Sequence, residues 1–292
     1  MKDIRSDNLD TLWDFGDPAA SAQRFESLLA DIDAKQQPAL RAEAQTQWAR
    51  ALGLQDRFAE AHLILNEIDP GIVDASPRVR VRNLLERGRV FNSSGDQAQA
   101  VPLFLQAWEC AQAPELDYYA VDAAHMLAIA LPPEEQRHWM EKGVHRAESS
   151  DDPKARGWLG ALHNNLGWTR HDAGDFTGAL QSFESALAAF QSNGKPQQVH
   201  IARWAVARAL RSLDRVDEAL EMQLMLLDDL DALGEKDGYV HEEIAECLLV
   251  CARPHEATRH FAQAHALLSA DSWLSAHEPD RIERLRALGS PR

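Results

Sequence analysis

Arginine and tryptophan side chains recur at one position of a long-period pattern, and they are well suited to bind an anion or a peptide. Arg50, Arg89, Trp168 and Arg208 each come directly after a small residue. The planar guanidinium of arginine can hold a carboxylate or a phosphate through two parallel hydrogen bonds, and it stays charged at any relevant pH. The pattern therefore predicts an anion-recognising surface that takes acidic peptides or free carboxyl termini.

A second interpretation gives the same residues a structural role. The chain contains 24 arginines and six lysines, so an arginine at an exposed position can reflect composition alone. The arginines of residues 78–82 can form a solvated helix face paired with acids of adjacent helices, and such surface pairs contribute little to stability. Trp168 and Trp204 can fill gaps between stacked helices, which is the more common role of a large aromatic residue. Both interpretations stay open from the sequence.

Catalytic and metal-binding motifs do not emerge from the sequence. His255 and His260 are five residues apart, whereas a zinc hydrolase helix needs histidines four apart so that both face the metal. Cys247 and Cys251 share one predicted helix but have no second pair, so we expect two buried, reduced thiols. The sequence also lacks the GxxxxGK, GxGxxG and GxSxG motifs. We therefore predict a protein that is not an enzyme and that needs no cofactor or metal.

The elements that position these side chains follow from a helix-hairpin signature that returns seven times. In the clearest copy, Leu166-Gly167, Gly174-Asp175-Phe176, Ala179 and Phe183 have the spacing of two short antiparallel helices. A period of 38 to 40 residues separates the reference residues of the copies, which are Ser21, Ala61, Ala100, Met140, Ala179, Ala219 and Ala257. Such a period predicts stacked hairpins, each of which buries its apolar face against its neighbours.

Small residues are expected where the two helices of a hairpin approach each other. In the first helices these are Ala49, Gly88, Ala128, Gly167, Ala207 and Ala245. In the second helices a small residue is followed four positions later by a large apolar one on the same face, as in Ala61 with Leu65, Ala100 with Phe104, Ala179 with Phe183 and Ala257 with Phe261. Gly95 and Gly174 mark helix ends, and the aspartate after each caps the next helix.

The copies predict one continuous domain over residues 1–292. The repeats are expected at approximately 1–36, 37–75, 76–113, 114–150, 151–194, 195–233 and 234–271, with a C-terminal cap or tail at 272–292. The first pair has a short first helix, and copies two, four and seven lack the glycine turn. Residues 278–285 are predicted to form a final capping helix with a proline in its first turn.

Composition supports a soluble all-α protein. Hydrophobic residues make up 45% and charged residues 26% of the chain, and alternating strand patterns are absent. No stretch of ~18 apolar residues occurs, and the first residues are polar, so we predict a cytoplasmic location without membrane binding. The formal charge is −16, which makes nucleic acid an unfavourable partner. Predicted second helices carry acids that should face solvent, namely Asp214, Asp217, Glu218, Glu221, Asp228, Asp229 and Asp231.

The chain resembles the tetratricopeptide repeat (TPR) family over essentially its whole length. The resemblance is carried by Leu166-Gly167, Gly174-Asp175-Phe176, Ala179 and Phe183 and by the period. The period exceeds the usual length of about 34 residues, as in a long-repeat bacterial type. The copy departs from the family pattern at His163, where an aromatic residue is expected, and at Arg170.

The resemblance implies a right-handed α-solenoid with a concave groove lined by the first helices. The side chains expected in this groove are Arg50, Arg82, Arg89, Asn164, Asn165, Trp168, Trp204, Arg208, Arg211 and Tyr239. Each asparagine amide offers a donor and an acceptor to a peptide backbone. We predict a non-enzymatic adaptor or scaffold for proteins or peptides, and a homodimer is compatible with it. The alternatives are a sensor that responds to a peptide or small effector, and a scaffold subunit of an enzyme or secretion complex that binds through its helix edges.

Overall fold

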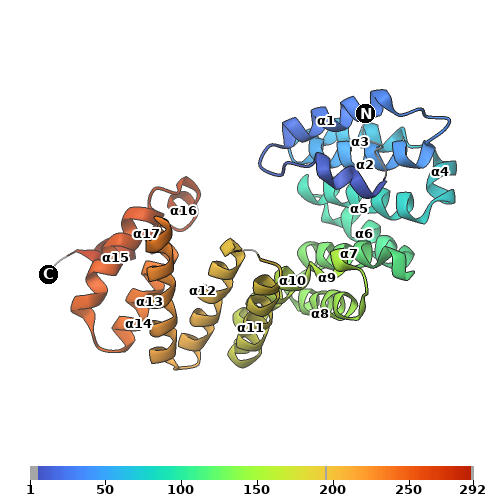
Figure 1. Cartoon of the computed structure of the whole chain (residues 1–292). Coiled ribbons are helices and arrows are strands. Elements are labelled where there is room, and N and C mark those ends of the chain that lie inside the picture. The colour runs from blue at the N-terminus through green and yellow to red at the C-terminus, as the bar shows by residue number, and fades with distance from the viewer. Residues whose placement is uncertain (1–5, 195, 291–292) are drawn as a thin grey trace. The chain divides into compact units, whose positions relative to one another are not determined.

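A computed structural model describes residues 6–194 and 196–290, which form helices and turns, with no strand among them. The chain divides into two compact units, Met1–Leu159 (unit 1) and Gly160–Arg292 (unit 2). In Figure 1, the helices of unit 1 run from blue to green and those of unit 2 from yellow-green to red. The single continuous domain inferred from the repeats stays a prediction.

Unit 1 is built from antiparallel helix hairpins. The pairs α2 with α3, α5 with α6 and α7 with α8 pack against each other, and α2 also packs on α1 and α5. The first pair has only a short 3-10 helix, η1, before α1, as the sequence predicts. The elements are η1 Ser6–Leu12, α1 Pro18–Asp31, α2 Pro38–Gly53, α3 Phe58–Asn66, α4 Pro70–Ala75, α5 Pro77–Ser93, α6 Gln97–Cys110, η2 Pro114–Leu116, α7 Asp117–Ala130, α8 Pro133–Ser149 and α9 Pro153–Arg156.

Unit 2 repeats the same hairpin plan. Helices α12 and α13 pack together, as do α14 and α15, and α17 closes on α15. The predicted capping helix is therefore confirmed, and its Leu285 is fully buried. The elements are α10 Leu159–Asp172, α11 Phe176–Ser192, α12 Pro196–Ser212, α13 Val216–Leu233, α14 Gly238–Val250, α15 Pro254–Leu268, α16 Ser272–His277 and α17 Pro279–Gly289.

The predicted close contacts between the two helices of a hairpin are confirmed in both units. A Cβ on Gly88 would lie 2.4 Å from the Phe104 ring, and a Cβ on Gly167 would lie 2.4 Å from the Phe183 ring. Both phenylalanine side chains are fully buried. Gly160, which the repeat pattern did not mark, makes the same contact with Phe190.

Five turns between paired helices place a residue in the left-handed conformation, whether or not that residue is glycine, whereas the turn between α7 and α8 uses Leu131 and Pro132 at negative φ. Gly95 has φ +87° and Gly174 has φ +80°. In copies without glycine the same conformation is held by Asp56, Asp214 and Ala252, with φ between 56° and 59°. Copy six, which has Asp214 at this position, therefore also lacks a turn glycine, in addition to copies two, four and seven. Aspartate tolerates this conformation because its side chain can bond locally, whereas alanine carries the full steric cost.

Within residues 6–194 and 196–290, no helix has the length and apolar character needed to cross a bilayer. The acids predicted to face solvent on α13 and in its preceding turn are all exposed. Helix α13 therefore presents an acidic surface, and the first helices carry the residues considered next.

Candidate functional site

In unit 1, Arg82 of α5 is buried between two first helices. Only 6% of Arg82 is exposed. Its Nε donates to the Tyr119 hydroxyl of α7 at 2.8 Å and lies 3.5 Å from Glu43 Oε2 of α2. Burial opposes the charge of Arg82, but Tyr119 and Glu43 outweigh it and raise the pKa of the guanidinium. Arg82 therefore connects helices and does not present its charge to solvent.

Arg89 directly follows Gly88 on α5 and is paired with two carboxylates. Its Nη2 lies 2.5 Å from Asp122 of α7, and its Nη1 lies 2.7 Å from Glu86 of α5. Burial disfavours the charged form of each partner. The Arg89 guanidinium nevertheless holds the pKa of the Asp122 carboxyl below its usual value, and Asp122 raises the pKa of Arg89. Arg89 and Asp122 are therefore both charged, and each neutralises the other.

Arg50 completes a lattice of charges in unit 1. Its Nη1 lies 3.8 Å from Glu86 Oε1, and its guanidinium lies 5.5 Å from the centroids of the stacked Trp13 and Phe15 rings. Three arginines thus meet three carboxylates from adjacent first helices, which are Glu43, Glu86 and Asp122. We call this set the unit 1 charge lattice.

In unit 2, aromatic rings form a row across neighbouring first helices. Trp168 of α10 and Trp204 of α12 have ring centroids 5.7 Å apart, and Tyr239 of α14 lies 6.1 Å from Trp204. The Trp204 indole donates to the Tyr239 carbonyl at 3.0 Å, and Arg281 of α17 lies 5.3 Å over the Tyr239 ring. Ile201, one turn before Trp204, is 51% exposed. These side chains give unit 2 an aromatic row with exposed apolar members.

Next to this row, two arginines share one carboxylate. Arg211 binds both oxygens of Glu243, with Nε at 2.5 Å and Nη2 at 3.0 Å. Arg208 reaches the same carboxylate only at 3.9 Å and donates from Nη1 to Ser212 Oγ at 2.7 Å. Burial and the like charge of Arg211 lower the pKa of Arg208. A further anion beside Arg208 would relieve this repulsion.

Three polar residues of α10 were considered next to these arginines, namely His171, Asn164 and Asn165. His171 Nε2 lies 3.0 Å from Ser212 Oγ, and burial followed by the charge of Arg208 lowers the pKa of His171. Asn164 precedes Trp168 by one turn, so the two share a face, but the Asn164 Oδ1 atom is buried without a hydrogen-bond partner. The Asn165 carbonyl accepts from Thr169 at 3.1 Å. Asn164 can therefore offer this oxygen to a peptide only after a side-chain rotation.

The predicted site residues fall into two groups. Arg50, Arg82 and Arg89 belong to the unit 1 charge lattice, and the other seven lie on α10, α12 and α14 of unit 2. The second interpretation of the sequence paired Arg82 with acids of adjacent helices on a solvated face, but it did not name the carboxylates, and Arg82 is buried. Aligning the copies could have found them, because Glu86 and Glu243 stand at one repeat position, two residues before the small residues Gly88 and Ala245.

No group of three or more metal-ligating side chains occurs in the described part of the chain. Cys110, Cys247 and Cys251 are free thiols there. Cys247 is fully buried, and burial together with Glu243 raises its pKa to about 12, whereas Cys251 is half-buried. The expectation of two buried thiols thus holds fully only for Cys247, because Cys251 directly follows α14 and is half-buried.

Comparison with solved structures defines the class of fold. A signal transduction ATPase with numerous domains and a TPR sensor, from Pyrococcus horikoshii, superposes with TM-score 0.71 at 10% identity over 92% of this chain and 41% of its own. The apo form of RapI gives TM-score 0.68 at 7% identity over 97% and 82% of the two chains. The Cut9-Hcn1 heterotetramer of the APC/C gives 0.56 at 17% identity over 98% and 49%.

The chain therefore has an all-α, TPR-like repeat fold. It spans less than half of the length of the Pyrococcus protein. No protein-family profile and no curated protein matches the sequence. At these identities the likeness concerns the fold, and the site has to be judged from its own chemistry.

Proposed function

We propose that this chain is a non-enzymatic peptide-binding adaptor whose ligand lies on the first-helix face of unit 2. The observation that carries the proposal is the shared carboxylate of Glu243, which leaves Arg208 at 3.9 Å from its nearest anion beside an exposed apolar row. In unit 1, Arg50 at the same repeat position belongs to the charge lattice, in which three guanidiniums meet three carboxylates. Unit 2 is therefore the better binding face.

The geometry of α12 suggests the form of the ligand. Ile201 and Arg208 share a helix face and are seven residues apart, which corresponds to about 10 Å along the axis. An extended peptide covers about 3.3 Å per residue. A carboxylate on Arg208 would thus come with an apolar side chain about three residues upstream, over Ile201 and Tyr239. A free C-terminus or an acidic side chain both supply that carboxylate.

The test compares two arginines at one repeat position. A display library of short peptides with free C-termini is selected on the full-length protein, and the selected peptides are labelled for fluorescence anisotropy. Arg208→Ala should weaken binding at least tenfold, and Arg50→Ala should leave binding unchanged. Amidating the peptide C-terminus separates recognition of the terminal carboxylate from recognition of an acidic side chain. Equal loss in both variants, or none in either, would refute the proposed site.

A sensor is the second candidate function. The observation that favours it is the Pyrococcus structure, which is described as carrying a TPR sensor. In that role a bound peptide or small effector would change the arrangement of the hairpins, and small-angle scattering with and without ligand would detect the change. A scaffold that binds through helix edges would instead tolerate Arg208→Ala without loss of assembly. The cytoplasmic location and a bacterial source stay predictions.

A further inference from the structure

The segment before α1 departs from the other first helices at the position that sets helix packing. Leu9 of η1 stands twelve residues before Ser21, where the other six copies have alanine or glycine. A side chain as large as leucine prevents the close helix approach that Gly88 and Gly167 allow. Leu9 is instead fully buried in the apolar cluster of the first hairpins. Residues 9–15 therefore lie on unit 1 as a separate segment and not as the first helix of a tight hairpin.

The next residue, Asp10, carries an acid at a repeat position where four other copies have a cation or an indole. Those residues are Arg50, Arg89, Trp168 and Arg208. Asp10 Oδ2 lies 2.6 Å from Lys154 Nζ of α9, and Asp10 Oδ1 lies 4.0 Å from Arg82 Nη2 of α5. Lys154 is 144 residues away in the sequence. The carboxylate of Asp10 thus faces cations of two distant helices, as the carboxylate of a bound peptide would.

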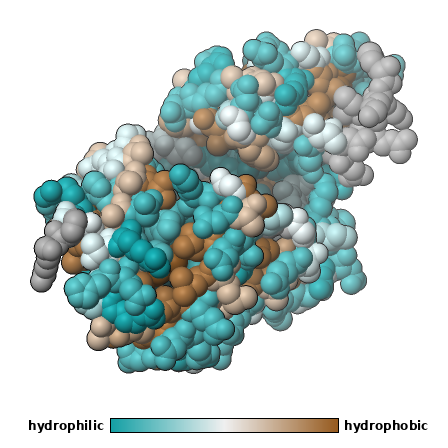
Figure 2. Space-filling model, turned by 60° about the vertical axis from the view of Figure 1, so that its left-hand side comes forward, coloured by the Kyte–Doolittle hydropathy of each residue, from teal (hydrophilic) through white to brown (hydrophobic). Residues whose placement is uncertain are grey.

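Two aromatic rings follow this acid and lie over α2. The rings of Trp13 and Phe15 are stacked with their centroids 4.8 Å apart. Trp13 Nε1 donates to Gln47 Oε1 at 3.1 Å, and the Arg50 guanidinium lies 5.5 Å from each ring centroid, within the range of a cation–π contact. Phe15 is 63% exposed, and Figure 2 shows that both units expose apolar side chains among hydrophilic ones. The first-helix face of unit 1 thus accepts a carboxylate followed three residues later by an aromatic ring.

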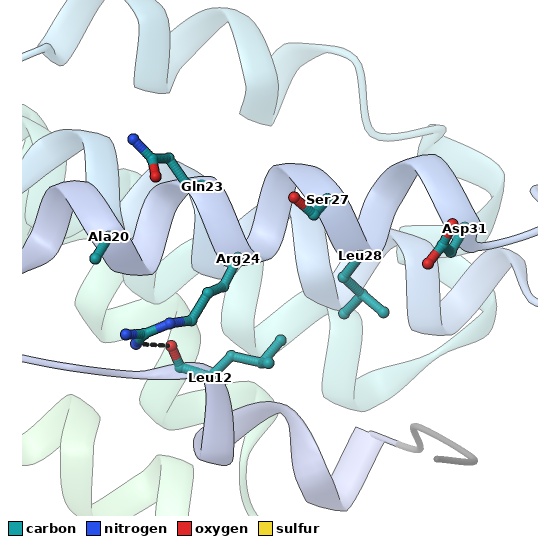
Figure 3. A pocket seen from close by; sticks show the side chains of 7 residues that line it. All are labelled: Leu12, Ala20, Gln23, Arg24, Ser27, Leu28 and Asp31. Carbon is teal, nitrogen blue, oxygen red and sulfur yellow. Dashed lines mark hydrogen bonds between the residues drawn. The ribbon is translucent and has the colours of Figure 1, made fainter. Parts of the chain in front are cut away.

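A turn at the end of the segment is held by α1 and not by the first helices. The Asp14 amide donates to Ser21 Oγ at 2.8 Å, and the Ser21 hydroxyl donates to the Asp14 carbonyl at 2.9 Å. Figure 3 shows Arg24 of α1 donating to the Leu12 carbonyl at 3.1 Å. The turn can therefore stay on α1 when the acid and the rings before it leave the first helices.

The contacts of the segment with the first helices are incomplete. The distance of 4.0 Å between Asp10 and Arg82 is too long for a hydrogen bond, and Arg82 Nη1 is buried without a hydrogen-bond partner. The side chains of Asp10 and Lys154 are 48% and 53% exposed, and an ion pair of this kind contributes little to stability. A competing peptide can therefore replace these contacts with better ones.

We propose that the first-helix face of unit 1 is a second peptide site, which residues 9–15 of the chain itself occupy. Its ligand is a segment of another protein in which an apolar residue and an acid are followed, three residues after the acid, by an aromatic one. The ligand enters when residues 9–13 leave, whereas the turn at Asp14 stays on α1. This site is separate from the face around Arg208 in unit 2, so it does not depend on the function proposed for that face.

Fluorescence anisotropy with a labelled, C-terminally amidated peptide of residues 6–17 tests the proposal. All proteins are full length and carry Arg208→Ala, so that the face of unit 2 does not contribute. The release variant, Asp10→Arg/Trp13→Ala, places an arginine beside Arg82 and Lys154 and removes the indole that Gln47 binds. It should bind the peptide at least tenfold more tightly than the parent protein, in which the chain's own segment competes at a high effective concentration.

Asp31→Arg/Trp273→Ala is the matched control, because it makes the same two changes outside the site. Asp31 lines the hollow beside α1 that Figure 3 shows, and Trp273 of α16 is 58% exposed. This variant should bind the peptide as weakly as the parent protein does. A peptide that itself carries Asp10→Arg and Trp13→Ala should not bind to any of the proteins. Circular dichroism checks that each variant is folded.

Hydrogen exchange of the wild type decides the matter if the release variant does not fold. The Trp13 amide donates to the Asp10 carbonyl at 3.3 Å, so its exchange reports the release of the segment. It should exchange at least a hundredfold faster than the amides within α2, because the segment opens while the hairpins stay folded. Equal protection of Trp13 and α2 overturns the proposal. So does a folded release variant that binds the peptide no better than the parent or the matched control.

Discussion

The first helices of the two units place different chemistry at the same repeat positions. Six residues before the small residue of each first helix, unit 1 has Glu43, Arg82 and Asp122, which all belong to its charge lattice. The same row in unit 2 is Ala161, Ile201 and Tyr239. Contacts between the helices of a hairpin are alike in both units, as Gly88 and Gly167 show. Packing between the two helices of a hairpin is thus alike in both units, whereas this row of first-helix positions differs between them and is buried in unit 1.

Arg50 and Arg208 sharpen this comparison because their nearest acids also correspond. Arg50 lies 3.8 Å from Glu86, and Arg208 lies 3.9 Å from Glu243. What differs is the second arginine at each glutamate. Arg89 has Asp122 as a further partner, whereas the Arg211 guanidinium is satisfied by Glu243 itself. The additional carboxylate is Asp122. It neutralises Arg89 in unit 1, whereas the described part of unit 2 has no corresponding second carboxylate for Arg208 and Arg211.

The largest predicted effect comes from removing one arginine of the unit 1 charge lattice. Arg89→Ala should destabilise the protein by about 3–5 kcal/mol, because it leaves the buried carboxylates Asp122 and Glu86 without their main partner. Arg208→Ala, at the same repeat position in unit 2, should cost less than ~1 kcal/mol. Urea unfolding followed by circular dichroism measures both. Equal losses would mean that the two faces do not differ as described.

A buried histidine should make unit 2 sensitive to mild acid. Burial, followed by the charges of His241 and Arg259, lowers the pKa of His260 from 6.5 to about 4. Between pH 6.5 and about 4, the unfolded chain therefore binds a proton at His260 that the folded chain does not bind. This contribution to stability is complete above pH 6.5 and falls by about 3 kcal/mol as the pH drops towards 4.

Unfolding of wild type and His260→Gln at a series of pH values measures that loss. The variant should lose the part of the slope between pH 6.5 and 4 that His260 contributes, whereas other histidines with a lowered pKa, such as His125 and His171, keep theirs. The lowered pKa of Asp122 in unit 1 acts at more acidic pH, because a carboxyl of this kind loses its contribution only as it is protonated. Identical slopes for the two proteins would contradict the role of His260.

Packing between the helices of a hairpin should respond equally in both units. Gly88→Leu and Gly167→Leu should each destabilise by more than ~2 kcal/mol, because the new side chain meets a buried phenylalanine ring at a contact of 2.4 Å. Ala188→Leu, at an exposed position of α11, is the control and should be neutral. Chemical unfolding measures the three variants. A stable Gly167→Leu protein would show that the helix register is wrong.

The smallest predicted effect is a gain of stability at a turn. Ala252 holds φ +56° without a polar side chain, so Ala252→Gly should stabilise by about 1 kcal/mol. Asp56→Gly at φ +58° in unit 1 should gain less, because aspartate tolerates this conformation. Thermal unfolding compares the two variants with the wild type. A lower melting temperature for Ala252→Gly would contradict this account of the turn.

Much of the fold was predictable because its decisive contacts are local. Gly167 and Phe183 are 16 residues apart within one hairpin, and the spacing of small and large residues was enough to pair them. The site was predictable only in part. Trp204, Tyr239 and Arg208 were correctly placed on first helices, but the burial of Arg82 and the pairing of Arg89 depend on carboxylates 33 to 39 residues away.

By itself, the sequence determined which small and large residues pack within a hairpin, since those contacts follow from apolar spacing along one short segment. Only the tertiary structure decided which charges are neutralised. Glu243 binds two arginines of the preceding first helix, Arg208 and Arg211. This pairing depends on how neighbouring hairpins stack, because side chains from separate repeats meet only there.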